Sequence, residues 1–346
     1  MVNKQRQFMG KVIQSVDVGS GFTKYVTKQI GKDISCALFP SVAKAAVGGL
    51  KSFQKTGIGA KQTTICVEVK GNKYEVGPDV DVVGASRQLD DNYSASAAHE
   101  ALLLGALSFV GKTNIDLLML GLPVHTFEQN REKLIEKFTG ELFTWDQRTG
   151  ERVVTKVNRV EVVPQPLGAL YNYGIFRGEM DRVKRGNNLI IDPGMNTLDW
   201  WVSEGLKPKI SRCDSGGGIG MWSVLQLLAD KISEDHFDGR PLDPNVRIDH
   251  ALRTDWMVTL YQKDIDLKNY KPLIQSKIDQ NINEMFNSIK TIADIDNILV
   301  AGGAGLLFGE VIKHRLPDNK VTILPDSIYS NVKGFQGCGM AIMGEL

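Results

Sequence analysis

Two stretches of this 346-residue sequence place a carboxylate just before a glycine-containing turn, with an apolar strand after it. The first, VDVGSGFTK at 16–24, contains Asp17, the turn GSG at 19–21 and Lys24. Glycine lets backbone N–H groups approach an anion because it has no Cβ, and lysine neutralises phosphate oxygens as a point charge. The stretch is therefore compatible with a phosphate-binding loop, but taken alone it favours a plain β-hairpin with a glycine turn, which has the same pattern.

The second stretch, IDPGMNTLD at 191–199, repeats this arrangement about half the chain later, with Asp192 in the place of Asp17. Such an internal repeat favours phosphate binding over two unrelated hairpins. Two hairpins facing each other would clamp a triphosphate, and the two aspartates would hold a hydrated Mg²⁺. The residues predicted to contact the nucleotide are Gly19, Ser20, Gly21, Phe22 and Lys24 in the first hairpin, and Gly194, Asn196 and Thr197 in the second.

Two other glycine-rich loops do not fit the spacing. A Walker A loop needs GxxxxGK[ST]; the segment GKT at 111–113 supplies its end, but Ala106 stands where the first glycine is required. A Rossmann GxGxxG must open a helix, whereas GSGFTKYV continues into β-branched and aromatic residues. Both loop types are therefore excluded.

A third glycine segment, NILVAGGAGLLF at 297–308, runs from a short apolar strand into Gly302, Gly303 and Gly305 and then into a helix. Glycines at such a turn let a ligand pack close to the backbone. Alone, the segment also fits a plain strand–helix turn. As the third element after two phosphate hairpins, it favours a nucleotide site.

With these motifs the sequence resembles the actin superfamily, whose members share two phosphate hairpins and a glycine-rich adenosine loop. DVGSGFTK is similar to the first phosphate loop of actin, and YSNVKGFQGCGM at 329–340 resembles the closing segment of bacterial ParM/StbA-like plasmid-segregation proteins. SRCDSGGGIG at 211–220 resembles the loop that follows the second hairpin, which implies nucleotide contacts from Asp214, Gly216, Gly217 and Gly218. The same segment also fits a helix start capped by Asp214 or Ser215.

The resemblance implies an α/β, actin-like (ribonuclease H-like) fold of two packed domains with a nucleotide cleft between them. Domain I would comprise 1–165 and about 325–346, and domain II 166–324, with an inserted subdomain at about 236–271. The hydrophobic pattern predicts hairpins at 12–26, 63–76 and 188–203, strands at 115–122, 207–213 and 298–300, a strand pair at 152–163, and helices at 95–110, 128–138, 167–173, 219–232, 272–292, 306–314 and 332–343.

Gln165, in VEVVPQPLGALY at 160–171, stands where the superfamily places its water-activating residue. Glutamine cannot act as a general base, but it can orient an attacking water through its amide. Gln165, Asp17 and Asp192 are the expected catalytic residues; alternatively, Gln165 only separates two prolines that shape a turn. Met195 and Asn196 replace the small residues usual in the second loop, so the sequence does not establish which atoms of this loop would contact the γ-phosphate.

Composition excludes several other classes. The formal net charge of +1 argues against direct DNA binding through an extended basic surface, while a small local basic patch stays open. The four cysteines lie far apart and predict neither a zinc site nor a disulfide framework, and no apolar run is long enough to cross a membrane. We expect a cytoplasmic protein with a solvated tail at 1–10.

The expected function is an actin-like ATPase that binds ATP with Mg²⁺, assembles into filaments and moves plasmid DNA. Its partners would be further copies of itself and a DNA-binding adaptor, without direct DNA or membrane binding. The alternatives are a sugar or carboxylate kinase of the same superfamily and a cytoskeletal scaffold. GTP stays possible in place of ATP, because the residues that read the base are expected in the unmatched region around 244–254.

Overall fold

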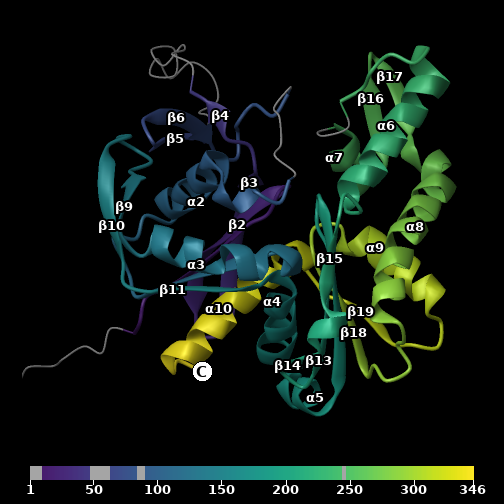
Figure 1. The fold of residues 1–346 in the computed structure, drawn as a ribbon. Coiled ribbons are helices and arrows are strands. Elements are labelled where there is room, and N and C mark those ends of the chain that lie inside the picture. Colours follow the sequence, from purple (N-terminus) through teal and green to yellow (C-terminus); the bar gives the residue numbers. More distant parts are fainter. Residues whose placement is uncertain (1–9, 47–62, 84–89, 244–246) are drawn as a thin grey trace, which may run out of the picture.

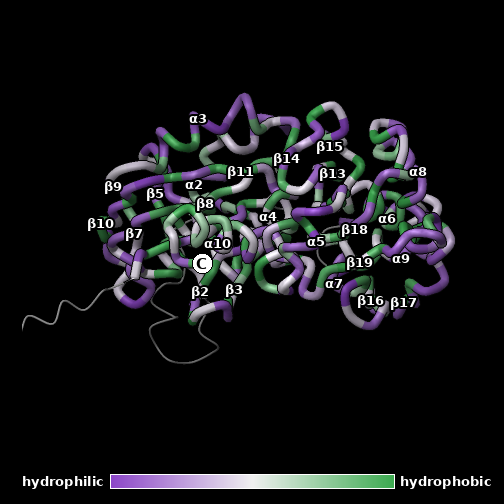
Figure 2. The backbone as a smooth tube through the Cα atoms, turned by 90° about the horizontal axis from the view of Figure 1, so that it is seen from below, coloured by the Kyte–Doolittle hydropathy of each residue, from purple (hydrophilic) through white to green (hydrophobic). Residues whose placement is uncertain are grey.

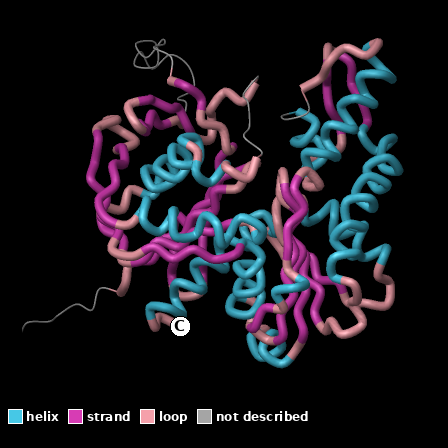
Figure 3. Tube along the Cα trace, in the orientation of Figure 1, coloured by secondary structure: helices cyan, strands magenta, loops and turns pink. Residues whose placement is uncertain are grey.

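The computed structural model describes residues 10–46, 63–83, 90–243 and 247–346 (Figure 1). Residues 1–9 of the expected tail at 1–10, and residues 244–246 of the expected base-reading region, lie outside these residues. The chain forms two α/β halves that stand side by side, with helices outside the sheets and between them (Figures 1 and 3). The predicted α/β class is therefore confirmed.

The sheet of the first half has the strand order β11-β8-β1-β2-β3. Strands β1 and β8 are buried at every residue, as is typical of strands that are covered on both faces. β1 is parallel to β8 and antiparallel to β2. The bounds are β1 (Ile13–Val18), β2 (Phe22–Ile30), β3 (Asp33–Pro40), β8 (Leu117–Leu122) and β11 (Val160–Pro164).

Helix α2 (Ala97–Val110) covers one face of this sheet, where its leucines pack with Val16 and Leu118. Ser96 caps its first turn by accepting a hydrogen bond from the backbone N–H of His99 at 3.1 Å. Gly111 ends it in the left-handed conformation, with φ of 69°. Around these elements lie β4 (Lys44–Ala45), β5 (Ile65–Val69), β6 (Asn72–Val76), β7 (Asn114–Ile115), β9 (Gly140–Trp145), β10 (Arg152–Val157) and α3 (Phe127–Phe138).

One expectation for this half is wrong. The residues 152–163 do not form a strand pair, because β10 pairs with β9 and β7 whereas β11 pairs with β8 in the central sheet. Hydrophobic alternation indicates the strands but not their partners.

The sheet of the second half has the order β14-β13-β12-β18-β19, and β15 pairs with β13. Trp200 and Trp201 follow each other on β13 and enter different cores, one on each face. The strands are β12 (Asn187–Pro193), β13 (Thr197–Glu204), β14 (Lys207–Pro208), β15 (Asp214–Gly217), β18 (Asn297–Val300) and β19 (Val321–Ile323). The helices are α5 (Met180–Arg185), α6 (Met221–Phe237), α8 (Lys271–Ile289) and α9 (Gly305–Arg315).

Two further expectations are wrong here. The strand expected at 207–213 is limited to β14, because a 3₁₀ turn at Ile210–Arg212 follows it. The segment around Asp214 does not cap a helix; it forms β15, and Gly220 is the N-cap of α6.

The expected insertion contains α7 (Arg247–Arg253) and the hairpin of β16 (Met257–Leu260) and β17 (Lys263–Asp266). Val258 and Ile265 of this hairpin join the same core as α6 and α8. Hydrophobic segments follow the interior strands, whereas hydrophilic ones lie at the periphery, as in α3 (Figure 2). Within the described residues, no helix is long and apolar enough to span a membrane.

Helices α4 (Gln165–Tyr171) and α10 (Ser330–Met343) lie between the two sheets (Figure 1). They cross in backbone contact, because a Cβ on Gly334 would lie only 1.6 Å from the carbonyl oxygen of Gly168. Farther along α10, Phe335 and Cys338 pack with Ile13 of β1. The last helix of the chain therefore returns to the first half.

Candidate functional site

The β1–β2 hairpin carries a buried ion pair. Asp17 and Lys24 are direct cross-strand partners, and the Lys24 Nζ lies 3.0 Å from the Asp17 Oδ2. The two side chains are only 1% and 12% exposed, respectively. A Cβ at Gly19 would lie 3.0 Å from the same Nζ, so the glycine leaves room for the lysine in this position.

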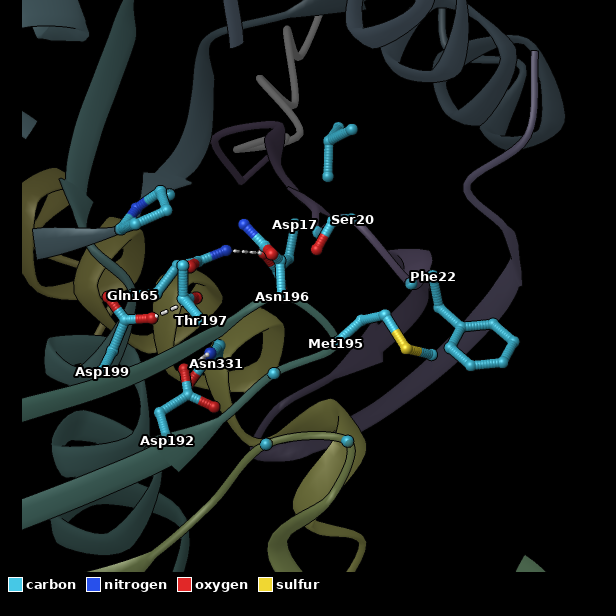
Figure 4. Close-up of a pocket in the computed structure, with 18 of the residues that line it drawn as sticks. Asp17, Ser20, Phe22, Gln165, Asp192, Met195, Asn196, Thr197, Asp199 and Asn331 are labelled. Carbon is cyan, nitrogen blue, oxygen red and sulfur yellow. Dashed lines mark hydrogen bonds between the residues drawn. The ribbon is translucent and has the colours of Figure 1, made fainter. Parts of the chain in front are cut away.

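Gln165 is the first residue of α4 and is buried. Its Nε2 donates a hydrogen bond to the Asp17 Oδ1 at 2.8 Å (Figure 4). Pro164 ends β11 before it, and Pro166 lies in the first turn of α4. The prolines therefore shape the turn, and the same turn directs the amide toward the aspartate of the first hairpin.

The β12–β13 hairpin places two carboxylates opposite each other, since Asp192 and Asp199 are register partners. Asp199 accepts hydrogen bonds from the Thr197 hydroxyl at 2.6 Å, from the Ser215 hydroxyl, and from the backbone N–H of Val124 at 3.0 Å. Val124 belongs to the first half of the chain. Asp199 therefore connects the second hairpin to a turn beside β8.

Burial raises the pKa of Asp192 to about 7, and the neighbouring carboxylate of Asp199 adds to the rise. A hydrogen bond from the Asn331 side chain opposes it. Burial also raises the pKa of Asp199, while its hydrogen bonds from Ser215 and Thr197 lower it. Ionising Asp192 and Asp199 in this buried position is therefore energetically unfavourable unless a cation compensates their charge.

The third glycine segment presses directly on Asp192. Gly302 has a φ of 75°, and a Cβ there would lie 2.2 Å from the Asp192 Oδ1 and 2.7 Å from the Pro193 carbonyl oxygen. The backbone N–H of Ala304 also donates to that carbonyl at 3.0 Å. The loop after β18 and the second hairpin therefore form one contiguous surface.

The two hairpin turns touch through Met195, which is buried. A Cβ on Gly21 would lie 3.0 Å from the Met195 Cβ, so the first turn is in close contact with the second. Figure 4 shows the Met195 side chain extending toward Phe22. The methionine that replaces a small residue therefore fills the space between the turns.

These elements surround a cleft of about 990 Å³, including space open to solvent. Of the predicted site residues, those that line it are Asp17, Gly19, Ser20, Gly21, Phe22, Lys24, Gln165, Asp192, Gly194, Asn196, Thr197, Gly302 and Gly303.

The structure does not bring the other predicted residues to this cleft. Asp214, Gly216 and Gly217 belong to β15, which pairs with β13, and Gly218 follows that strand. Gly305 begins α9, and a Cβ there would meet Ser327 rather than the cleft. The contribution of β15 is indirect, through the Ser215 hydroxyl that donates to Asp199.

The lining residues that were not predicted from the sequence include Asp199, Arg253 and Asn331. Asp199 had a usable signal, because it ends the motif IDPGMNTLD on the strand that faces Asp192. Asn331 lies in the closing segment that supported the resemblance, but no role was expected for it. Its contact with Asp192 joins residues far apart in sequence, which local patterns do not indicate.

Arg253 of α7 connects three elements around the cleft. Its Nη1 donates to the Gly303 carbonyl at 2.5 Å, and its guanidinium lies 5.6 Å from the centre of the Phe22 ring. Asp249, one turn earlier, accepts a hydrogen bond from its Nε at 3.0 Å. Arg253 also lies within the region where base-reading residues were expected.

The donor set fits a hydrated divalent cation. Among the described residues, no cluster of three or more histidine, cysteine or acidic side chains could enclose a metal by itself. Mg²⁺, however, is commonly held by one or two carboxylates together with phosphate oxygens and retained waters. Asp17 and Asp192, which line the same cleft from opposite hairpins, provide such a pair.

Comparisons with known proteins agree with this architecture. Residues 15–168 match the family described as "Actin like proteins N terminal domain". The archaeal actin homolog Ta0583 matches with a TM-score of 0.77 and 19% identity, over 95% of this chain and 99% of that one. The complex of Ta0583 with ADP matches with a TM-score of 0.75 and 20% identity, over 95% of this chain and 99% of that one. A 15-stranded ParM filament from Clostridium botulinum matches with a TM-score of 0.71 and 19% identity, over 96% of this chain and 100% of that one.

No curated protein matches the chain in sequence. The fold and the paired hairpins define an actin-like α/β protein. Residues 15–168 match a family of actin-like N-terminal domains, and the chain as a whole has an actin-like fold, similar to the structures of ParM-like proteins. The predicted actin-like fold is thus confirmed.

Proposed function

We propose that this chain is an ATPase that binds Mg²⁺–ATP in the cleft and assembles into filaments in a nucleotide-dependent way. The observation that carries the proposal is the convergence of three separate loops on one cleft. Asp192 contacts the Gly302 backbone, and both line the cleft with the facing hairpin of Asp17. Backbone N–H groups of such glycine turns suit the phosphates of a nucleotide.

In the proposed reaction, a water oxygen attacks the γ-phosphorus, and the bond between that phosphorus and the bridging oxygen of ADP breaks. Lys24 neutralises phosphate oxygens as a fixed charge, since its partner Asp17 orients it. Gln165 holds the attacking water through its side-chain amide, which already lies at Asp17. When bound between Asp17 and Asp192, Mg²⁺ would neutralise the charge that develops on the departing diphosphate.

We place the nucleoside beyond Gly303. The cleft shares Arg253, Gly303, Ala304 and Ile328 with a second cavity of about 1230 Å³, solvent space included. Leu252, Leu306 and Leu307 contribute apolar surface there, as a base requires. Arg253 would hold the junction between the two cavities through the Gly303 carbonyl.

We further propose that domain I comprises 1–165 with about 325–346, and domain II 166–324. The return of α10 to β1 supports this division. Nucleotide would then bridge the domains, and its hydrolysis would alter the contacts between subunits in a filament. A filament was solved for the ParM of Clostridium botulinum. We propose by analogy that filaments of this chain move plasmid DNA through a DNA-binding adaptor.

The test is nucleotide-dependent assembly. The purified chain is mixed with Mg²⁺ and ATP, GTP, ADP or a non-hydrolysable ATP analogue, and light scattering, pelleting and phosphate release are recorded. We expect assembly with ATP and with the analogue. Of the three adenine nucleotides, only ATP should give phosphate release. Assembly in none of these solutions, over a wide concentration range, would refute the filament proposal.

Asp192→Ala and Asp214→Ala form a matched pair for the site. The first removes a carboxylate of the cleft, whereas the second removes one that lies outside it. We expect Asp192→Ala to abolish phosphate release and Asp214→Ala to keep it. Undiminished hydrolysis by Asp192→Ala would refute the site.

A further inference from the structure

Asn331 joins the last helix to the second hairpin. It is the second residue of α10 and is 5% exposed. Its Nδ2 donates a hydrogen bond to the Asp192 Oδ2 at 2.7 Å. Asp192 is ionised when it holds a cation, and an ionised carboxylate only accepts hydrogen bonds, so in that state the amide nitrogen of Asn331 faces it.

The other end of the amide has no partner. The Asn331 Oδ1 is buried and accepts no hydrogen bond from the described residues. Asn331 nevertheless lines the cleft beside Asp192 (Figure 4). A buried acceptor without a donor destabilises the folded protein, so a bound group that donates to this oxygen would remove the cost.

We infer that Asn331 is a positioning residue for the cation: its Nδ2 holds Asp192 in place, and its Oδ1 accepts a hydrogen bond from a water molecule on the bound divalent cation. Waters retained by Mg²⁺ are strong donors, and amide oxygens are suitable acceptors for them. This inference rests on the proposed function, because it assigns a role within the same site.

A purely structural role for Asn331 has to be separated from this one. Farther along α10, the Gln336 Oε1 accepts a hydrogen bond from the Ser15 hydroxyl at 2.8 Å, on β1 of the first half. The helix is thus held at both halves, and loss of Asn331 could simply loosen it. Loosening would weaken nucleotide binding with and without Mg²⁺, whereas loss of a cation contact would weaken it only with Mg²⁺.

The experiment measures the affinity of the full chain for ATP with excess Mg²⁺ and with excess EDTA. The variant is Asn331→Leu, which keeps the size of the side chain but has no polar atoms. The control is Ser330→Ala, because Ser330 is the adjacent residue of α10, is fully buried, and does not line the cleft. Trp200 next to Asp199 offers an intrinsic fluorescence signal, and thermal unfolding shows that each variant is folded.

We expect Asn331→Leu to lower the affinity by about tenfold or more with Mg²⁺, as is usual for residues that orient metal ligands. Its affinity in EDTA should stay within about twofold of the unmodified chain, which a purely structural role would not produce. Ser330→Ala should leave the ratio of the two affinities unchanged.

Unchanged affinities of Asn331→Leu in both solutions would overturn the inference while leaving ATP binding intact. A parallel loss in both solutions would overturn it in favour of the structural role. If Asn331→Leu does not fold, Asn331→Ser provides the same comparison, since its hydroxyl is too short to make both contacts. Failure of the unmodified chain to bind ATP would instead refute the proposed function, and the inference with it.

Discussion

The backbone of Gly302 lies so close to Asp192 that a Cβ on this glycine would be 2.2 Å from the carboxylate oxygen Oδ1. The neighbouring Gly303 has no such restriction, because a Cβ there would meet only Ile328, at 3.9 Å. One position of the GG pair therefore requires glycine, and the other has room for a methyl group.

Gly302→Ala should displace the loop after β18 or the Asp192 side chain. The left-handed backbone at 302 costs an alanine about 1 kcal/mol, and the overlap with Asp192 and Pro193 adds to this. We expect a lower melting temperature and a loss of ATP binding, both measured by thermal unfolding with and without nucleotide. Gly303→Ala is the control and should retain most of the stability. Equal stability of the two variants would contradict the described packing.

Gln165→Ala should separate binding from hydrolysis. The amide contacts Asp17 and is proposed to hold water, so its removal should slow phosphate release by about a hundredfold. ATP affinity should change by only a few fold, because the phosphate-binding turns stay in place. Single-turnover hydrolysis together with equilibrium binding measures both quantities. A proportionate loss of affinity and rate would show that Gln165 acts through the structure of the cleft.

His99 gives the protein a pH-dependent term in its stability. It is 3% exposed, and burial, with a smaller effect from Lys137, lowers its pKa from 6.5 to about 3. The unfolded chain therefore binds a proton below pH 6.5 that the folded chain does not bind. This term is fully present above pH 6.5 and is lost as the pH falls toward 3.

Between pH 7 and pH 5, this residue should lower the free energy of unfolding by about 2 kcal/mol. His99→Phe should remove that part of the pH dependence, as measured by urea unfolding at both values. His314→Phe is the control, because His314 is exposed. Identical pH profiles for His99→Phe and the unmodified chain would disprove the assignment.

Gly334→Ala tests the crossing of α4 and α10. On an isolated helix, alanine would be favoured over glycine by about 1 kcal/mol. Here the new Cβ would lie 1.6 Å from the Gly168 carbonyl oxygen, so the helices have to separate. We expect destabilisation by about 3 kcal/mol or more, measured by denaturant unfolding. Ala341→Gly, at an exposed position of α10, should lower the free energy of unfolding only by the helix propensity difference between alanine and glycine, about 1 kcal/mol. Similar effects of the two substitutions would argue against the close crossing.

The sequence was sufficient to predict those elements that carry a recognisable local motif. The two Asp–Gly hairpins and the strand before Gly302 are short patterns whose strands and turns follow from neighbouring residues. The strand expected at 207–213 failed because apolar residues alone do not distinguish a strand from the 3₁₀ turn that Ile210 begins. Strand β3 at Asp33–Pro40 was missed, since its burial is irregular.

The same limit applies to the site: residues inside local motifs were predicted, and residues placed by helix packing were not. The residues predicted from the motifs line the cleft, except Gly305. Asp214, Gly216, Gly217 and Gly218 were assigned only through the resemblance, and they lie in or next to β15. Asn331 and Arg253 reach the cleft from α10 and α7, and their positions depend on how whole helices pack. No spacing in the sequence encodes such contacts.

The contact between Met195 and Gly21 has a kinetic consequence. The two turns that would hold the phosphates touch each other directly. In the proposed function the phosphates lie between these turns, so this contact would have to open before they bind. The observed rate of association should then rise with nucleotide concentration only up to a ceiling, which is the rate at which the turns separate.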